Sequence, residues 1–160
     1  MSRMRRLTCV LSRRALEVMN EERVRCSGME TGGVLVGCAN SDVVWVEEAL
    51  GPGPNAKHGR YSFEPDSPHD AERIARAYEA SGRRLSYLGD WHTHPYGRPY
   101  LSSRDLATLS SIADHPPARV SQPVMIVVAD SIGAWQYRGR RWGGLRQCIA
   151  RVNLVLEPTV

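Results

Sequence analysis

The segment Gly89-Asp90-Trp91-His92-Thr93-His94-Pro95 decides how this chain is interpreted, because it places two histidines at alternate positions near the end of an apolar run. The run Leu85–His92 predicts a buried strand. Alternate side chains of a strand share a face, so the imidazoles of His92 and His94 are expected to point the same way. Pro95 has no backbone N–H to donate, so the strand should end there and leave both rings at its rim.

After His94, the segment Ser102-Ser103-Arg104-Asp105 predicts the start of a helix, with ten residues between His94 and Asp105. Asp105 would lie one turn into that helix and offer a carboxylate beside the two imidazoles. Two histidines and one carboxylate, with a fourth position left to water, are typical of catalytic zinc sites. Each of these two motifs also has a simpler interpretation that involves no metal. A His-x-His pair often marks ordinary surface or core histidines, and Ser102 with Asp105 resembles a helix capping box.

Strands and helices alternate along the rest of the chain, which predicts an α/β (α+β) fold with a mixed sheet flanked by about three helices. Strands are expected at Leu7–Leu11, Thr31–Gly37, Val43–Ala49, Tyr61–Phe63, Leu85–His92 and Val124–Ala129, and helices at Arg13–Arg23, Pro68–Ser81 and Ser102–Asp114. Gly133–Tyr137 is predicted to pair with Arg141–Leu145 across a turn at Arg138-Gly139. No linker or repeat divides the chain, so residues 1–160 are expected to form one domain.

The composition favours a folded, cytosolic protein. Hydrophobic residues make up 42% of the 160 residues and charged residues 24%. No apolar run approaches the roughly 18–20 residues of a membrane span, and Leu7–Leu11 is too short for a signal peptide. The net charge of +4 comes from scattered arginines, so neither a nucleic acid nor a membrane is an expected partner. The four cysteines form no CxxC pair and are expected to be reduced thiols.

The combined pattern resembles the signature of the JAMM (MPN-domain) zinc metalloproteases, of the compact prokaryotic type. The resemblance rests on His92-x-His94-x(10)-Asp105 and on the upstream segment Glu30–Gly37, which resembles the glutamate-bearing strand of that family. It implies one catalytic Zn²⁺ held by His92, His94 and Asp105. It also implies that Glu30 acts as general base and that Ser102 helps to hold the oxyanion. Leu101 stands where many members have proline, which puts the shape of this loop in doubt.

The resemblance implies an isopeptidase or peptidase that cleaves at the C-terminus of a ubiquitin-like protein. Ubiquitin-activating and conjugating-like enzymes are then expected partners. The resemblance also implies that the protein acts within an antiphage conjugation system. Two alternatives remain open: a non-catalytic MPN scaffold that binds partner proteins, and a hydrolase that releases an amino acid from a thiocarboxylate carrier protein.

Other aromatic and titratable side chains are expected to lie outside the set of metal ligands. Trp91 alternates with the histidines and is expected in the core, whereas Asp90 is a candidate for orienting a zinc-binding imidazole. His58, His69 and His115 are expected in loops or at helix ends, exposed to solvent.

Overall fold

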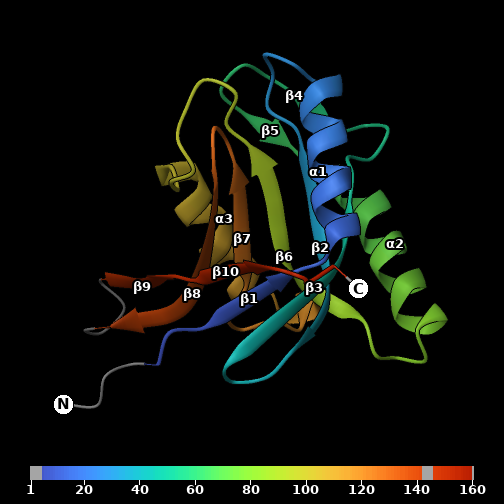
Figure 1. Ribbon diagram of the computed structural model, residues 1–160. Coiled ribbons are helices and arrows are strands. Elements are labelled where there is room, and N and C mark those ends of the chain that lie inside the picture. Colours follow the sequence, from blue (N-terminus) through green and yellow to red (C-terminus); the bar gives the residue numbers. More distant parts are fainter. Residues whose placement is uncertain (1–4, 142–145, 160) are drawn as a thin grey trace.

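The computed structural model describes residues 5–141 and 146–159 as one mixed sheet of eight strands with three α-helices around it (Figure 1). The predicted α/β (α+β) fold is therefore confirmed. The elements are β1 (Thr8–Leu11), α1 (Arg13–Arg25), β2 (Gly32–Ala39), β3 (Val43–Leu50), β4 (Lys57–His58), β5 (Phe63–Glu64), α2 (Ser67–Ala80), β6 (Ser86–Thr93), α3 (Ser103–Ala113), a 3-10 turn η1 (Pro116–Ala118), β7 (Val124–Val128), β8 (Ile132–Arg141), β9 (Arg146–Arg151) and β10 (Asn153–Leu156). None of the described helices is long and apolar enough to cross a membrane.

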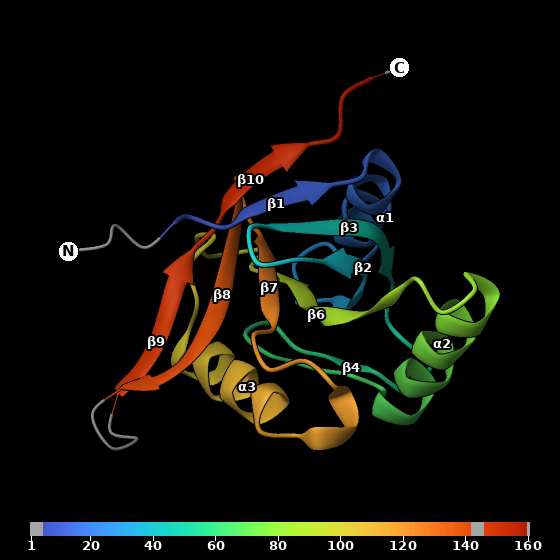
Figure 2. The ribbon, with the colours of Figure 1, turned by 90° about the horizontal axis from the view of Figure 1, so that it is seen from below.

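The sheet curls until its two outer strands are successive parts of the chain. Its order is β10-β1-β3-β2-β6-β7-β8-β9, and β4 with β5 forms a separate two-stranded hairpin. Strands β9 and β10 are separated by Val152 alone, which is buried and donates its backbone N–H to Ala134. The C-terminal strand therefore pairs with β8 before this bend and with β1 after it, as Figure 2 shows.

The core lies on both faces of this sheet. One face packs against α1, whose Ala15 and Met19 are fully buried, and Ser12 caps this helix by accepting from the backbone N–H of Ala15. Successive residues of β7 alternate between this cluster and a second one, in which Met125 and Val127 pack against Leu109 of α3. Helices α1 and α3 thus cover opposite faces, as period-two alternation along a strand requires.

The predicted hairpin turn at Arg138-Gly139 is wrong. Strand β8 continues through these residues to Arg141, and its pairing with β9 shifts register between Tyr137 and Arg140. Gly139 has φ of 95°, which lets the chain form a bulge and keep pairing afterwards. Residues 142–145, which belong to the predicted partner strand Arg141–Leu145, lie outside the described residues.

The contact between β2 and β6 depends on two glycines. Gly32 lies opposite His92 and Gly33 opposite Trp91 in the antiparallel register. A Cβ atom on Gly33 would overlap the carbonyl oxygen of Leu50 and lie 3.0 Å from the indole nitrogen of Trp91. Trp91 is fully buried, as predicted, and its indole N–H donates to that same carbonyl at 3.0 Å. Glycine is required at position 33 because the backbones of Gly33, Leu50 and Trp91 and the indole ring of Trp91 meet there.

We expect Gly33→Ala to lower the free energy of unfolding by about 1–3 kcal/mol, because overpacking forces the strands apart. Urea unfolding followed by circular dichroism measures this. Gly51→Ala is the matched control, since a Cβ there meets only ordinary contacts with Glu22, and its effect should stay within about 0.5 kcal/mol. Equal stability of the two variants would contradict this account of how β2 packs against β3 and β6.

Candidate metal centre and active site

Three potential metal ligands converge at the end of β6. One ligand atom from each of His92, His94 and Asp105 lies within 4.8 Å of the other two. The two Nε2 atoms are 2.9 Å apart, and Asp105 places its carboxylate oxygens 3.2 Å from Nε2 of His92 and 3.4 Å from Nε2 of His94. All three side chains are at most 12% exposed. Two imidazoles and one carboxylate aimed at a common point fit a divalent metal with a position left open.

Backbone pairing on both sides of the strand end holds the two histidines in place. Thr93, between them, donates its N–H to the carbonyl of Thr31 at 2.8 Å, and its hydroxyl accepts from the N–H of Thr31. On the other side the N–H of His94 donates to the carbonyl of Val128 at 2.8 Å. The chain therefore stays extended through His94, and both rings keep the shared orientation predicted from their alternation.

A second hydrogen bond orients the ring of His94. Its Nδ1 lies 2.9 Å from the carbonyl oxygen of Arg98. Because a carbonyl can only accept, Nδ1 carries the proton and Nε2 presents its lone pair to the other ligands. A backbone carbonyl behind a ligating imidazole is a common way to set its tautomer and direction.

Asp105 is held by the capping box at the start of α3. The hydroxyl of Ser102 accepts from the N–H of Asp105 at 3.2 Å, and the carboxylate of Asp105 accepts from the N–H of Ser102 at 2.8 Å. The two readings of this motif are therefore compatible. One oxygen of Asp105 caps the helix and still lies 3.4 Å from His94, while the other faces His92. The capping box therefore holds the carboxylate of Asp105 beside the two imidazoles.

The electrostatics of the cluster favour a cation. Burial raises the pKa of Asp105, but hydrogen bonds from His92 and His94 outweigh burial and hold this pKa below its ordinary value. The hydrogen bond to Asp105 raises the pKa of His94, against the effect of burial. In the absence of a metal the site therefore favours a charged carboxylate next to a proton on imidazole. A divalent cation would replace that proton.

Glu30 joins this cluster from the segment before β2. One of its carboxylate oxygens lies 4.0 Å from Nε2 of His94, and its side chain is 13% exposed. Burial raises the pKa of Glu30, while the neighbouring histidines and Arg104 act in the opposite direction. A carboxylate with a raised pKa is a better proton acceptor, and the role of general base for Glu30 stays a prediction.

Sequence reasoning missed the contact that His58 makes with this cluster. His58 was expected to be exposed in a loop, but it is half-buried in β4, and its Nδ1 lies 3.0 Å from the carbonyl oxygen of Glu30. Of the other two histidines, His115 is exposed as expected, and His69 is half-buried at the start of α2. No local pattern marks His58, because it contacts Glu30 only through the fold.

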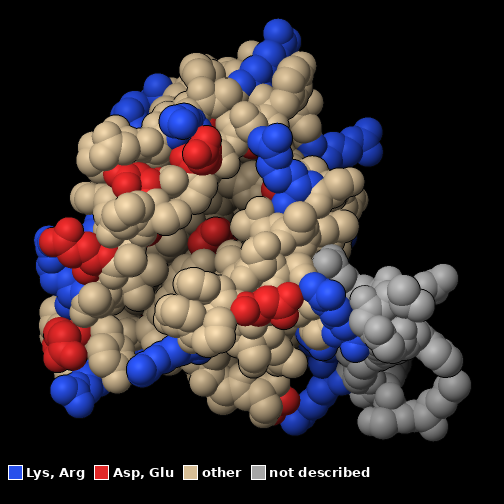
Figure 3. Space-filling model, turned by 180° about the vertical axis from the view of Figure 1, so that it is seen from behind, with Lys and Arg blue, Asp and Glu red and all other residues tan. Residues whose placement is uncertain are grey.

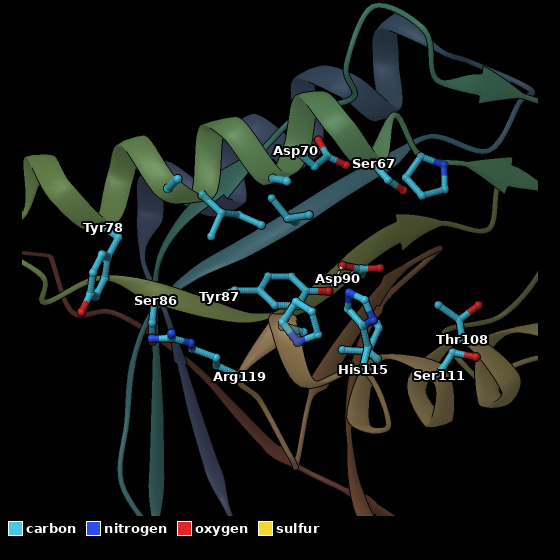
Figure 4. Close-up of a pocket in the computed structure, with 18 of the residues that line it drawn as sticks. Ser67, Asp70, Tyr78, Ser86, Tyr87, Asp90, Thr108, Ser111, His115 and Arg119 are labelled. Atoms are coloured by element: carbon cyan, nitrogen blue, oxygen red, sulfur yellow. Dashed lines mark hydrogen bonds between the residues drawn. The ribbon is translucent and has the colours of Figure 1, made fainter.

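An open groove of about 800 Å³ adjoins the metal centre on the same face of β6. Helices α2 and α3 form its walls, and Tyr87 and Asp90 of β6 lie between them (Figure 4). One face of α2 lines this groove with four largely apolar residues, none of which is buried: Ala71, Ile74, Ala75 and Tyr78. Figure 3 shows this face of the molecule hollowed. The three ligands do not line the groove, but Asp90, two residues before His92, and Arg104, next to Asp105, do.

Asp90, proposed above to orient an imidazole, instead accepts a hydrogen bond from the Tyr87 hydroxyl at 2.6 Å. No hydrogen bond from Asp90 to either ligand histidine is found within the described ranges. Burial raises the pKa of Asp90 to about 6. This residue is therefore part of the groove floor.

Metal content tests the triad directly. Purified protein supplied with zinc and then freed of excess should hold about one divalent ion per chain, measured by elemental mass spectrometry. His94→Ala removes a ligand and should abolish retention, whereas His115→Ala, in an exposed histidine outside the triad, should keep it. Retention of the ion by His94→Ala, or its absence from wild type, would contradict the assignment.

The pKa of Asp90 predicts a pH-dependent stability difference. The folded state binds more protons than the unfolded state between about pH 4 and 6, so this carboxyl destabilises the fold as pH rises through that window. Asp90→Asn keeps an acceptor for Tyr87 and cannot ionise. In metal-free protein it should be more stable than wild type at pH 7, by on the order of 1–2 kcal/mol, with the difference vanishing near pH 4. Urea titrations at both pH values measure this, and exposed Asp130→Asn should show no such trend.

Comparisons with known proteins agree with this geometry. Residues 12–142 match the family described as prokaryotic homologues of the JAB domain, Prok-JAB. A Sinorhizobium fredii protein named as a probable metalloprotease is 36% identical over 124 residues, which are 75% of this chain and 74% of that protein. A CD-NTase/cGAS isopeptidase of Enterobacter hormaechei is 30% identical over 131 residues, which are 80% and 71% of the two chains. A solution structure of a Desulfitobacterium hafniense protein shares the fold, with a TM-score of 0.67 at 16% identity over 96% and 95% of the chains.

The matched residues 12–142 contain Glu30 and all three residues of the triad. The predicted resemblance to JAMM-type enzymes is thus confirmed at the level of the family, and the names of its relatives agree with a metallopeptidase. This chain belongs to the Prok-JAB family of JAB-domain metallopeptidases.

Proposed function

We propose that this protein is a zinc-dependent isopeptidase that releases a ubiquitin-like protein, or a similarly conjugated protein, from its acceptor. The observation that carries the proposal is the convergence of Glu30 with His92, His94 and Asp105 from three separate segments. The donor set of two imidazoles and one carboxylate suits zinc. Zinc bound there would act as a Lewis acid on a carbonyl group and make water nucleophilic near neutral pH.

Glu30 is the residue proposed to move the proton. Hydrolysis adds water to the amide carbonyl carbon, breaks the C–N bond and leaves a carboxylate and an amine. The Glu30 carboxylate accepts a proton from the attacking water and delivers it to the leaving nitrogen. Its position 4.0 Å from His94 puts it at the edge of the metal centre.

Ser102 is proposed to stabilise the oxyanion. Its Oγ accepts a hydrogen bond from the N–H of Asp105, which leaves its own proton free to be donated. A donor aimed at a developing oxyanion typically contributes about 3–4 kcal/mol to catalysis. The same hydroxyl would therefore both help to hold a metal ligand in place and donate to the oxyanion.

The groove between α2 and α3 is proposed to receive the polypeptide that carries the scissile bond. It is open, lined largely by apolar and small side chains, and adjoins the triad through Asp90 and Arg104. An extended chain can lie along such a surface, whereas a small free amino acid would leave most of it empty. The groove thus favours a polypeptide over a small free molecule as its occupant.

The acceptor is proposed to be a CD-NTase-like nucleotidyltransferase. Relatives in Enterobacter hormaechei and Pseudomonas aeruginosa are named CD-NTase/cGAS isopeptidases. We extend that class of substrate to this chain, together with the cytosolic setting and the antiphage conjugation system expected from the sequence.

The test is cleavage of a CD-NTase that carries a protein in isopeptide linkage, followed by gel electrophoresis and mass spectrometry of the products. Zinc-loaded wild type should release both proteins intact. Glu30→Gln keeps the size of the side chain but cannot accept a proton, so kcat should fall by about 10²–10⁴-fold. Its zinc content and thermal melting should match those of wild type.

Chelation of the metal should abolish cleavage, and added zinc should restore it. Wild-type protein that holds zinc but leaves the conjugate intact would disprove the proposed substrate. Full activity in Glu30→Gln would instead remove Glu30 from the mechanism and favour another base.

A further inference from the structure

We infer that His58 is a positioning residue for Glu30: the hydrogen bond from its imidazole to the Glu30 carbonyl holds the catalytic carboxylate at the metal centre. This inference rests on the function proposed above, because it assigns Glu30 the role of base. The short β4–β5 hairpin that carries His58 lies next to the end of β6 (Figure 1).

The position of Glu30 depends on its backbone. Within residues 5–141 and 146–159, no hydrogen bond to its carboxylate oxygens is found, and Nε2 of His94 lies 4.0 Å from one of them. Glu30 also lies outside the sheet, in the connection between the end of α1 and the first residue of β2. The β2–β6 ladder brings the chain to this point, but the backbone hydrogen bonds of Glu30 itself are made outside it.

The hairpin binds both backbone polar groups of Glu30. The N–H of Glu30 donates to the carbonyl of Gly59 at 2.7 Å, and its carbonyl oxygen lies 3.0 Å from Nδ1 of His58. Because that carbonyl can only accept, Nδ1 must carry the proton. Loss of His58 would leave the carbonyl of Glu30 without this donor. Glu30 would then be held by one backbone hydrogen bond instead of two.

The imidazole is itself fixed. His58 pairs with Phe63 across the hairpin, and the centroids of the two rings are 5.4 Å apart. Phe63 also covers Gly32, since a Cβ built there would lie 3.0 Å from its ring and 3.0 Å from Cβ of His92. Hairpin, glycine and metal ligand therefore pack together, so a shift of His58 would be felt at the site.

The experiment compares two replacements of His58. His58→Asn places an amide N–H close to the position of Nδ1 and keeps the donor, whereas His58→Phe keeps a ring and removes it. With the conjugate assay above, His58→Phe should lower kcat by at least about tenfold with KM within about twofold, because small misplacements of a reacting group cost up to about 10²-fold. His58→Asn should recover activity to within about threefold of wild type.

A second measurement needs no substrate. Hydrogen exchange of the Glu30 amide, followed by NMR, reports how often this residue leaves the hairpin. His58→Phe should exchange at least about fivefold faster than both wild type and His58→Asn, at unchanged zinc content. Lys57→Ala is the control in the same strand, because it removes only an exposed ion pair with Glu64 and should change neither readout.

The outcomes separate the inference from the proposed function. Wild-type kcat and wild-type amide exchange in His58→Phe would overturn the inference, as would equal losses in the Asn and Phe variants, because the donor would then be irrelevant. If wild type fails to cleave the conjugate, or Glu30→Gln remains active, the proposed function fails. The amide exchange would still decide whether His58 holds Glu30.

Discussion

The antiparallel pairing of β2 with β6 is the constraint on which the site depends. With Gly32 opposite His92, the chain before β2 reaches the end of β6, and Glu30 arrives beside the two histidines. The absence of a side chain on Gly32 lets Phe63 and His92 approach from either side. A side chain larger than hydrogen at this point would separate the strands and with them the base and the ligands.

Charge within the cluster explains why these groups can be brought together at all. Carboxylates of Glu30 and Asp105 lie among imidazoles in a largely buried setting, where an unpaired charge is costly. Without a metal, the hydrogen bonds to Asp105 lower its pKa and raise that of His94, so a shared proton offsets the negative charge. The cluster is thus suited to bind a cation in place of that proton.

The residues that line the groove differ from those that stabilise the fold. The apolar residues on one face of α2 line an open surface, and the buried residue of this helix is Asp70, which is paired with Arg73 at 2.6 Å. Apolar side chains left uncovered next to reactive groups are typical of binding sites, because a ligand can complete the packing. Stability is supplied elsewhere, by the packing of α1 and α3 on the eight-stranded sheet.

Much of this protein follows from its sequence alone, because local patterns have local physical causes. Alternation along β6 placed His92 and His94 on one face, the Ser102-x-x-Asp105 spacing predicted the cap at α3, and the spacing between these motifs indicated the family. The turn predicted at Arg138-Gly139 failed, because a glycine with positive φ serves a bulge as well as a turn. Only the tertiary structure decided the contact of His58 with Glu30, the groove between α2 and α3, and the bend at Val152 that joins the two outer strands of the sheet. Each of these joins segments far apart in the chain, and no periodicity or spacing within one segment records which distant segment it will meet.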